Sequence, residues 1–460
     1  MSLDPLTALS PLDGRYRSKT KELAALFSEA SLFRHRVRVE VEYLLFLSKK
    51  RIIRTLSSKE QKKLKKLLEL ELEQIKQIKT IEAETHHDVK AVEYFLTEQL
   101  QSTSLKDCIP FIHFGLTSAD TNNLAYRLMI NQAHQQIMLP LLIRLLSRLK
   151  NMSSQYQDLA MLARTHGQPA LPTTLGKEIS VWAVRLLQQI IQLVEHKLNG
   201  KLTGAVGSFQ ALQFTFPDVD WIEASHEFVS SLGLEPNLHT TQINPADNLI
   251  ELLNHYQLTN SILIDLCQDF WRYISDNWLI QIKDKQQVGS STMPQKINPI
   301  RFENCEGNLQ LANGVIDTLS RKLAVSRLQR DLSNSTVNRN IGLVFGYSLL
   351  GWKSLSAGLT TVQPNKPKIS TDLNQNFNIL AEAMQTKLRQ QQDPQAYQKT
   401  AELTKSKCLK KKDWQQLVKP ISTDLHQLTP EDYTGLAAKL VTLAVEEIGH
   451  FLAEFKPDFE

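Results

Sequence analysis

The chain has 460 residues, of which 42% are hydrophobic and 22% are charged, with a formal net charge of +5. These values are ordinary for a globular protein with a large core, and the charge excess is too small to predict nucleic-acid binding, so we expect no nucleic-acid partner. Glycine, at 17 residues, is roughly half its usual ~7% share, which favours helices over a turn-rich β protein.

Neither the apolar segments nor the cysteines of the chain suggest a membrane protein or an oxidising compartment. The first residues, MSLDPLTALSPLDGRY, lack the basic and then apolar pattern of a signal peptide. The most apolar stretch, Ile341–Trp352, is shorter than the ~20 residues that a membrane helix needs. The four cysteines are far apart and form no CxxC pair, so neither a zinc site nor a disulfide framework is indicated. We expect a cytoplasmic protein with no membrane partner.

Helical periodicity dominates the chain, beginning with shorter patterns such as residues 59–81. From Asn122 to Lys150 apolar residues recur every three or four positions, and Pro140 should kink or divide this helix. Three more long helices are predicted: Gly176–Leu198, Asn248–Ile282 and Asn308–Val325. Helices of this length usually pack into bundles, and the lack of comparable alternating segments predicts little β structure.

The C-terminal part is set off by a change in composition. The segment VQPNKPKIST, residues 362–371, predicts a linker or turn before a C-terminal domain. Further on, Thr429–Asp432 has a threonine cap, a proline and two acids, which predicts the start of a helix.

Polar segments between the helices concentrate His, Arg, Lys, Ser and Asn, and a site that gathers them would bind several negative charges. They are Asp13–Tyr16, Thr85–Tyr94, His113–Asn123, Ala163–Pro172, Val288–Asn308 and Ser326–Asn340. The glycine-rich nucleotide motifs GxGxxG and GxxxxGK[ST] are absent, so phosphate is not held by such a loop.

From the residue types alone, structural interpretations of these segments remain open. His166 fits a hydrogen-bonded structural histidine, and Ser290 with Ser291 fits a turn or a helix cap. The adjacent His86 and His87 would point about 100° apart on a helix, so a helix start is favoured over a shared metal. A serine nucleophile is unsupported because the chain has no GxSxG elbow. The arginines of the segment 326–340 could equally be surface charges.

One segment carries a specific resemblance. GSSTMPQKINP, residues 289–299, resembles the signature loop G-S-S-x-M-P-x-K-x-N-P of the fumarase/aspartase superfamily. Within it, SPLDGRY, HHDVKAVEY, TSADTNN, RTHGQPA and RDLSNSTVNRN resemble adenylosuccinate lyases of the longer bacterial type. The motifs run in the expected order from residue 10 to about 350, and the resemblance is thinner after 365. Gln295 stands where many relatives have histidine or tyrosine.

The resemblance implies a carbon–nitrogen lyase of purine biosynthesis. The expected reaction is β-elimination of fumarate from adenylosuccinate, giving AMP, and from the succinylaminoimidazole carboxamide ribotide SAICAR, giving AICAR. General acid and base catalysis suffices, so no cofactor and no metal are expected. The alternatives are another fumarate-releasing lyase, of the argininosuccinate or aspartate type, and a helical scaffold without activity.

Two residues are implied as catalytic: His166 as the general acid and Ser290 as the general base. From chemistry alone, another histidine such as His87 would be the preferred base. A serine becomes basic only if the loop excludes water and supplies positive charge, for which Lys296 is the nearby cation. Gly289 gives the loop a flexible point, and Glu303 is expected to support it or to orient a histidine.

The implied substrate-binding residues fall into four groups. The implied phosphate and ribose contacts are Arg15, Tyr16, Arg330, Ser335 and Arg339. The succinyl carboxylates would be held by Thr117, Ser118 and Gln242. The segment beside the leaving group would be His86, His87 and Asp88. The contacts from the signature loop and the helix after it would be Ser291, Lys296, Ile297, Asn298 and Asn304. Among the histidines, His87 is expected to touch the substrate.

The resemblance also implies the architecture. The fold is expected to be all-α with three domains, residues 1–112, 113–364 and 365–460, and with long central helices shared across a homotetramer. Each active site would take segments from three subunits. The wide apolar faces of the long helices agree with this, since they exceed what one small bundle would bury.

Overall fold

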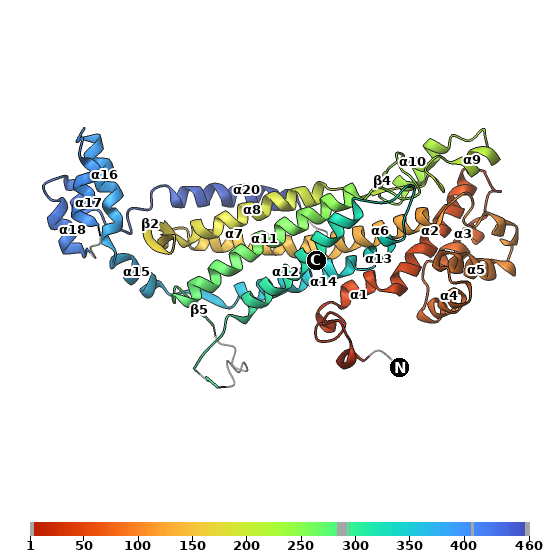
Figure 1. The fold of residues 1–460 in the computed structure, drawn as a ribbon, viewed down its shortest axis with the longest axis horizontal. Coiled ribbons are helices and arrows are strands. Elements are labelled where there is room, and N and C mark those ends of the chain that lie inside the picture. The colour runs from red at the N-terminus through yellow and green to blue at the C-terminus, as the bar shows by residue number, and fades with distance from the viewer. Residues whose placement is uncertain (1–3, 283–291, 294, 406–408, 456–460) are drawn as a thin grey trace. The chain divides into compact units, whose positions relative to one another are not determined.

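Helices make up most of the computed structural model, which describes residues 4–282, 292, 293, 295–405 and 409–455 (Figure 1). Among these residues, strands form only three two-stranded sheets. The all-α prediction is confirmed. No helix in these ranges is long and apolar enough to cross a membrane.

The chain divides into two compact units, each built from three segments. The first unit comprises Met1–Pro140, Gln192–Asn260 and Asn308–Leu350, and the second comprises Leu141–Ile191, Ser261–Gly307 and Gly351–Glu460. The three-domain division expected from the resemblance stays a prediction.

Short helices occupy the first hundred residues: α1 Lys21–Phe27, α2 Glu29–Lys49, α3 Ser58–Lys66, α4 Leu72–Thr85 and α5 Asp88–Gln101. The pattern at residues 59–81 is therefore two helices. A capping box between Ser57 and Glu60 begins α3, since the backbone nitrogen of Ser57 donates to the Glu60 carboxylate at 2.9 Å. A longer α2 packs against α6, Ser118–Ala133, with Leu32, Ala125 and Met129 buried between them.

Pro140 divides the predicted helix 122–150, as expected. Helix α6 ends at Ala133, a π-helical turn covers His134–Met138, and α7 runs over Leu139–Gln155. The wide turn lets Leu139 N bond to the His134 carbonyl, and it accommodates the ring of the following proline between α6 and α7.

The other long helices are α8 Leu175–Glu195, α11 Asp247–Ser275, α12 Ile300–Leu323 and α14 Ile341–Leu359. The prediction that α11 reaches Ile282 was wrong at its end. Asn277 adopts a left-handed backbone with φ 58°, and the chain then forms the strand β5, Leu279–Gln281, which pairs antiparallel with β6, Val362–Pro364. Backbone pairing with a distant strand is a tertiary effect that the apolar pattern does not reveal.

Shorter elements complete the two units. They are β1 Ala160–Thr165, β2 Gln168–Thr174, β3 Asn199–Gly200, β4 Glu235–Pro236, α9 Gln210–Thr215, α10 Trp221–Ser231 and α13 Ser333–Asn338, with α15 Lys366–Asn374, α16 Ala381–Gln390, α17 Ala396–Thr404, α18 Lys411–Val418, α19 Thr423–Gln427 and α20 Ala437–Glu454.

Two predictions about the C-terminal part were wrong. Residues 362–371 are not a linker but the strand β6 followed by α15, whose first turn is capped by the Asn365 side chain and accepts a proline. No helix starts at Thr429: its hydroxyl donates to Asp432 at 2.5 Å in a turn, and α20 begins only after Gly435, at φ 56°.

Candidate active site

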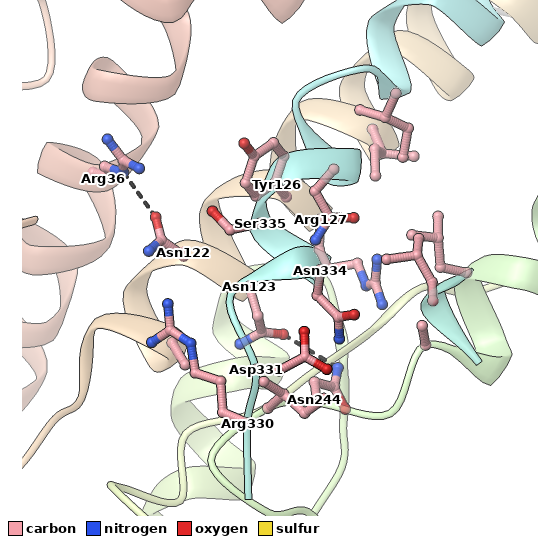
Figure 2. Close-up of a pocket in the computed structure, with 18 residues that line it drawn as sticks. Arg36, Asn122, Asn123, Tyr126, Arg127, Asn244, Arg330, Asp331, Asn334 and Ser335 are labelled. Atoms are coloured by element: carbon pink, nitrogen blue, oxygen red, sulfur yellow. Dashed lines mark hydrogen bonds between the residues drawn. The ribbon is translucent and has the colours of Figure 1, made fainter. Parts of the chain in front are cut away.

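A cavity of about 100 Å³ in the first unit gathers several of the predicted binding residues (Figure 2). Its wall comes from α6, from the segment leading into α11 and from residues 330–341 around α13. Arg330 and Ser335, predicted to hold phosphate and ribose, both line it. The predicted carboxylate contact Gln242 is next to it, since Arg330 Nη1 donates to Gln242 Oε1 at 3.3 Å. The structure thus brings these three residues together.

Asp88 forms an ion pair at this cavity. Arg36 Nη2 lies 2.5 Å from Asp88 Oδ2, while Arg36 Nε donates to Asn122 (Figure 2). Arg339 Nη2 approaches the same carboxylate oxygen at 3.8 Å. Burial opposes ionisation of Asp88, but the charge and hydrogen bond of Arg36 outweigh it, so the pKa of Asp88 is lowered. Sequence analysis missed Arg36, because an arginine inside an amphipathic helix gives no motif signal.

The two adjacent histidines have different backbone roles. His86 ends α4 in a left-handed conformation with φ 53°, and His87 caps α5, with its Nδ1 accepting from Lys90 N at 3.1 Å. This confirms the helix-start interpretation. Because Nδ1 is an acceptor, the ring proton of a neutral His87 lies on Nε2. Both side chains are exposed.

Thr117 and Ser118 begin α6, directly before the part of that helix that lines the cavity. Thr117 N donates to Asp120 Oδ2 at 2.9 Å, and the other oxygen of Asp120 accepts from Lys201 Nζ at 2.6 Å. This ion pair is fully buried, and Lys201 Nζ also donates to the Gly204 carbonyl at 3.0 Å. The first turn of α6 is therefore fixed by a satisfied internal pair.

His113 is a candidate site residue that sequence analysis quoted within a motif but did not assign. Its backbone is left-handed, with φ 57°, and both its N–H and its Nδ1 meet the buried carboxylate of Glu40, at 3.0 and 2.8 Å. Burial opposes protonation of His113, but the hydrogen bond and charge of Glu40 outweigh it and raise the pKa. The glutamate lies 73 residues away in sequence, so only the fold reveals the pair.

His166 lies in the second unit, at the tip of a hairpin. Strands β1 and β2 pair from Ala160↔Thr174 to Thr165↔Gln168, which leaves a loop of His166 and Gly167. Both have positive φ, at 52° and 74°, as two-residue hairpin loops of type I′ require. The Arg164 guanidinium closes the loop by donating to the Gly167 carbonyl at 3.2 Å.

The His166 side chain is exposed and makes no hydrogen bond within the described part of the chain. The interpretation of His166 as a hydrogen-bonded structural histidine was therefore wrong for this chain. A non-glycine residue held at positive φ is uncommon, and such residues cluster at functional sites.

The predicted catalytic loop is described only in part. Ser290 and Ser291, with Gly289, lie outside the described residues. Beyond them, Lys296 is exposed and the Ile297 carbonyl accepts from Gln281 Nε2 at 2.9 Å. The Asn298 side-chain oxygen is buried and has no hydrogen-bond partner among the described residues. A buried acceptor left unsatisfied at this point is suited to a ligand or to another chain.

Two further predicted residues lie on α12. Asn304 is half-buried there, and Glu303 accepts a hydrogen bond from Trp271 Nε1 at 3.1 Å. Within this chain Glu303 thus supports α11 rather than orienting a histidine. In the N-terminal segment, Arg15 is exposed and Tyr16 is half-buried before a short 3₁₀ turn.

No group of three or more His, Cys, Asp or Glu side chains in the described ranges could hold a metal ion.

The fold is that of the fumarate lyases. A fumarate lyase from Mesorhizobium sp. BNC1 superposes with a TM-score of 0.76 at 16% identity, covering 93% of this chain and 97% of that one. A family model described as "Lyase" matches residues 14–314, and one described as "Adenylosuccinate lyase C-terminal" matches residues 326–434. This defines the class of enzyme as a lyase.

Similarity to known proteins over nearly the whole chain narrows the class of lyase to one family. An adenylosuccinate lyase from Legionella pneumophila (strain Corby) is 43% identical over 452 residues, covering 96% of this chain and 99% of that protein. One from Dictyostelium discoideum is 42% identical over 458 residues, covering 95% and 98%. The chain belongs to the adenylosuccinate lyase family.

Proposed function

We propose that this enzyme eliminates fumarate from adenylosuccinate, giving AMP, and from SAICAR, giving AICAR. The observation that carries the proposal is the cavity lined by Arg330 and Ser335, with Arg36 and Arg127 also in its wall. Guanidinium groups are the preferred partners of phosphate. A phosphate-binding cavity suits the two purine substrates, whereas neither argininosuccinate nor aspartate carries a phosphate.

The reaction divides between two proton transfers. A base removes a proton from the succinyl carbon beside a carboxylate, the electron pair forms the new C=C bond, and the C–N bond breaks. His166 donates a proton to the departing nitrogen. An exposed imidazole on a turn stiffened by Arg164 suits this role, because histidine is the side chain most often used as a general acid or base near neutral pH.

Ser290 is the proposed base. A serine needs local positive charge and exclusion of water to act in this way. Lys296, six residues along the chain, is exposed and makes no ion pair within the described ranges, so its ammonium group is available to a closed loop. Lys296 and Asn298 would also stabilise the negative charge that develops on the carboxylate next to the attacked carbon.

His113 extends the set of proposed binding residues. It precedes Thr117 and Ser118, and Glu40 fixes its ring and favours its protonated form. A fixed imidazolium beside two hydroxyl donors is suited to a succinyl carboxylate. His87, whose exposed ring keeps Nε2 as its donor, is proposed to contact the leaving group.

We also propose that the enzyme is a homotetramer whose active sites are shared between subunits. A group that transfers a proton works best away from bulk water, yet His166 lies exposed on its hairpin. Apolar side chains also lie exposed on the long helices: Val181 on α8, Leu258 and Trp271 on α11, and Leu311 on α12. Neighbouring subunits would cover both. A cytoplasmic location fits the free thiols of Cys108, Cys267 and Cys305.

The test is a substrate panel. The purified enzyme should release equal amounts of fumarate and AMP from adenylosuccinate, and should release fumarate from SAICAR. It should release none from argininosuccinate or aspartate. Fumarate from either of the latter, with none from adenylosuccinate, would show that the enzyme is another lyase of the superfamily; no fumarate from any of the four would favour the inactive scaffold.

A further inference from the structure

A buried arginine, Arg127, stands at the cavity without a counter-charge. It lies on α6 and is 6% exposed. Its Nε donates to the Asn199 carbonyl at 3.2 Å. Within the described part of the chain its two terminal nitrogens donate no hydrogen bond, and no carboxylate lies within 4.0 Å of them. Buried charges are almost always paired, because leaving one unpaired is costly.

The charge of Arg127 is retained at neutral pH. Burial lowers the pKa of its guanidinium to about 10, which still leaves it protonated. Its field reaches the neighbouring His196, whose pKa is lowered first by burial and further by the charges of His255 and Arg127, against an opposing effect of Glu251. Arg127 therefore carries a positive charge at an enclosed position, and no carboxylate of the described residues balances it.

The asparagine side chains around Arg127 take their hydrogen-bond partners mainly from one another and from the backbone. Asn244 Nδ2 donates to the same Asn199 carbonyl at 3.4 Å and to Asn123 Oδ1 at 3.2 Å (Figure 2). Asn123 in turn donates to the Lys201 carbonyl at 2.9 Å. The network of Asn123, Asn244 and Asn199 is thus satisfied by itself and does not offer an acceptor to the terminal nitrogens of Arg127.

Asp331 also lines the cavity, and its charge is balanced by other groups. Its carboxylate accepts from Ser333 N at 2.8 Å and lies 3.8 Å from Lys322 Nζ and 3.7 Å from Arg327 Nη1. Lys322 Nζ also donates to Asn334 Oδ1 at 2.6 Å, so the acceptor of Asn334 is occupied. The amide nitrogen of Asn334 donates no hydrogen bond among the described residues, and it adds a second donor at the cavity.

The space itself fits a small anion. One water occupies roughly 10–15 Å³ by the measure used for such cavities, so about 100 Å³ has room for several waters or for one tetrahedral oxyanion. Apolar side chains, including Ile130, Leu249 and Leu323, form the rest of the wall. In such a setting an ion pair is weakly screened and strong.

We propose that Arg127 binds a phosphate-type oxyanion in this cavity, with Asn334 as a second donor. The anion is either the phosphate group of the nucleotide, in which case Arg127 is a further binding residue beyond Arg330 and Ser335, or free inorganic phosphate. The first case rests on the proposed function, and the second does not.

The test measures the thermal unfolding of the full-length enzyme with inorganic phosphate against chloride at equal ionic strength. Phosphate should raise the Tm of the wild type in a saturable manner. Arg127→Met keeps an unbranched apolar stem and removes the charge, and it should weaken phosphate binding by about tenfold or more. Arg144→Met, at an exposed position of α7, is the matched control and should keep the wild-type response.

Competition with AMP identifies the source of the anion. If AMP abolishes the further effect of phosphate, the cavity holds the phosphate of the nucleotide, and Arg127→Met should then raise the KM for adenylosuccinate with little change in kcat. If the two ligands act additively, the cavity holds free phosphate. Either result supports the proposal.

Two results would overturn it: a wild-type enzyme with no saturable response to phosphate, or an equal response in Arg127→Met. The first requires no variant, so the proposal is testable even if Arg127→Met does not fold. Failure of the proposed function would give a different result. The wild type would still respond to phosphate and Arg127→Met would not, but the wild type would release no fumarate from either purine substrate.

Discussion

His113 and His166 both stand at positive φ in polar segments, but their surroundings differ completely. Glu40 of α2 holds His113 through two hydrogen bonds, and Thr121 Oγ1 donates to the same carboxylate at 2.8 Å. His166 has no such partner and lies exposed on a two-residue loop. The chain itself supplies a hydrogen-bond partner for the His113 ring, whereas it leaves the His166 ring exposed.

The difference agrees with the two proposed roles, substrate binding for His113 and proton transfer for His166. His113 is held by a buried carboxylate that raises its pKa, so it is suited to binding an anion and it contributes to folding stability as well. The exposed His166 side chain makes no hydrogen bond within the described part of the chain, so it should add little to stability. We therefore expect substitutions at the two positions to separate turnover from stability.

The largest expected effect is on turnover in His166→Gln. Loss of the general acid should lower kcat by roughly 10²–10⁴-fold. Because the His166 side chain is exposed and makes no hydrogen bond within the described part of the chain, the Tm should stay within a few degrees of the wild type. Steady-state fumarate release and a thermal melt measure the two quantities, and near-normal kcat would refute the assignment of His166.

Glu40→Gln should show the opposite balance. It weakens three hydrogen bonds to a buried carboxylate and should lower the free energy of unfolding by about 2–3 kcal/mol. Glu42→Gln, on the same helix, is the control and should change it little.

The effect of Glu40→Gln should depend on pH. The pKa of His113 is raised in the folded state, so its contribution to stability is fully present below the unfolded value of about 6.5 and is lost as the pH rises through the raised value. Chemical denaturation at several pH values should show a smaller difference between wild type and variant at high pH. A difference that does not depend on pH would mean that His113 is neutral.

Asp88→Asn removes the carboxylate that Arg36 and Arg339 share, and it should lower stability by about 1–2 kcal/mol. The pKa of Asp88 is lowered, so its contribution is present above the unfolded value of about 3.9 and is lost as the pH falls through the folded value. The stability difference between wild type and variant, measured from pH 7 down to pH 3, should therefore shrink. A constant difference would contradict the ion pair as its source.

A smaller loss of stability than in Glu40→Gln or Asp88→Asn is expected for Gly167→Ala. The added methyl group meets nothing within 4 Å, but φ 74° disfavours it by about 1 kcal/mol. Because the same loop places His166, kcat should fall as well. Gly233→Ala is the matched control, with φ 78° and equally open space, and it should lose similar stability without loss of kcat. Equal kcat values in the two variants would show that the loop geometry does not matter.

The sequence predicted the elements that depend on local pattern. Apolar periodicity placed the long helices, and Pro140 marked the division between α6 and α7. Residues 276–282 and 362–364 were misassigned, because strands β5 and β6 exist only through pairing with each other. Motif resemblance placed Arg330, Ser335 and Gln242 in one site, which the structure confirms as neighbours.

Partners far apart in sequence could not be predicted in this way. Glu40 with His113, Arg36 with Asp88 and the isolated Arg127 all belong to helices whose pattern only indicates burial. A charged residue on a buried face is a usable signal in retrospect, because such residues are rarely buried without a role.

The most direct test of the central proposal, an active site shared between subunits in which His113 binds substrate and His166 donates the proton, is a hybrid experiment. His166→Gln and His113→Gln, each expected to have low turnover alone, are mixed under conditions that allow subunits to exchange, and exchange is verified by native mass measurement. The account predicts that adenylosuccinate turnover reappears, since some sites then receive both wild-type histidines. Verified hybrids that remain as inactive as their parents would contradict it.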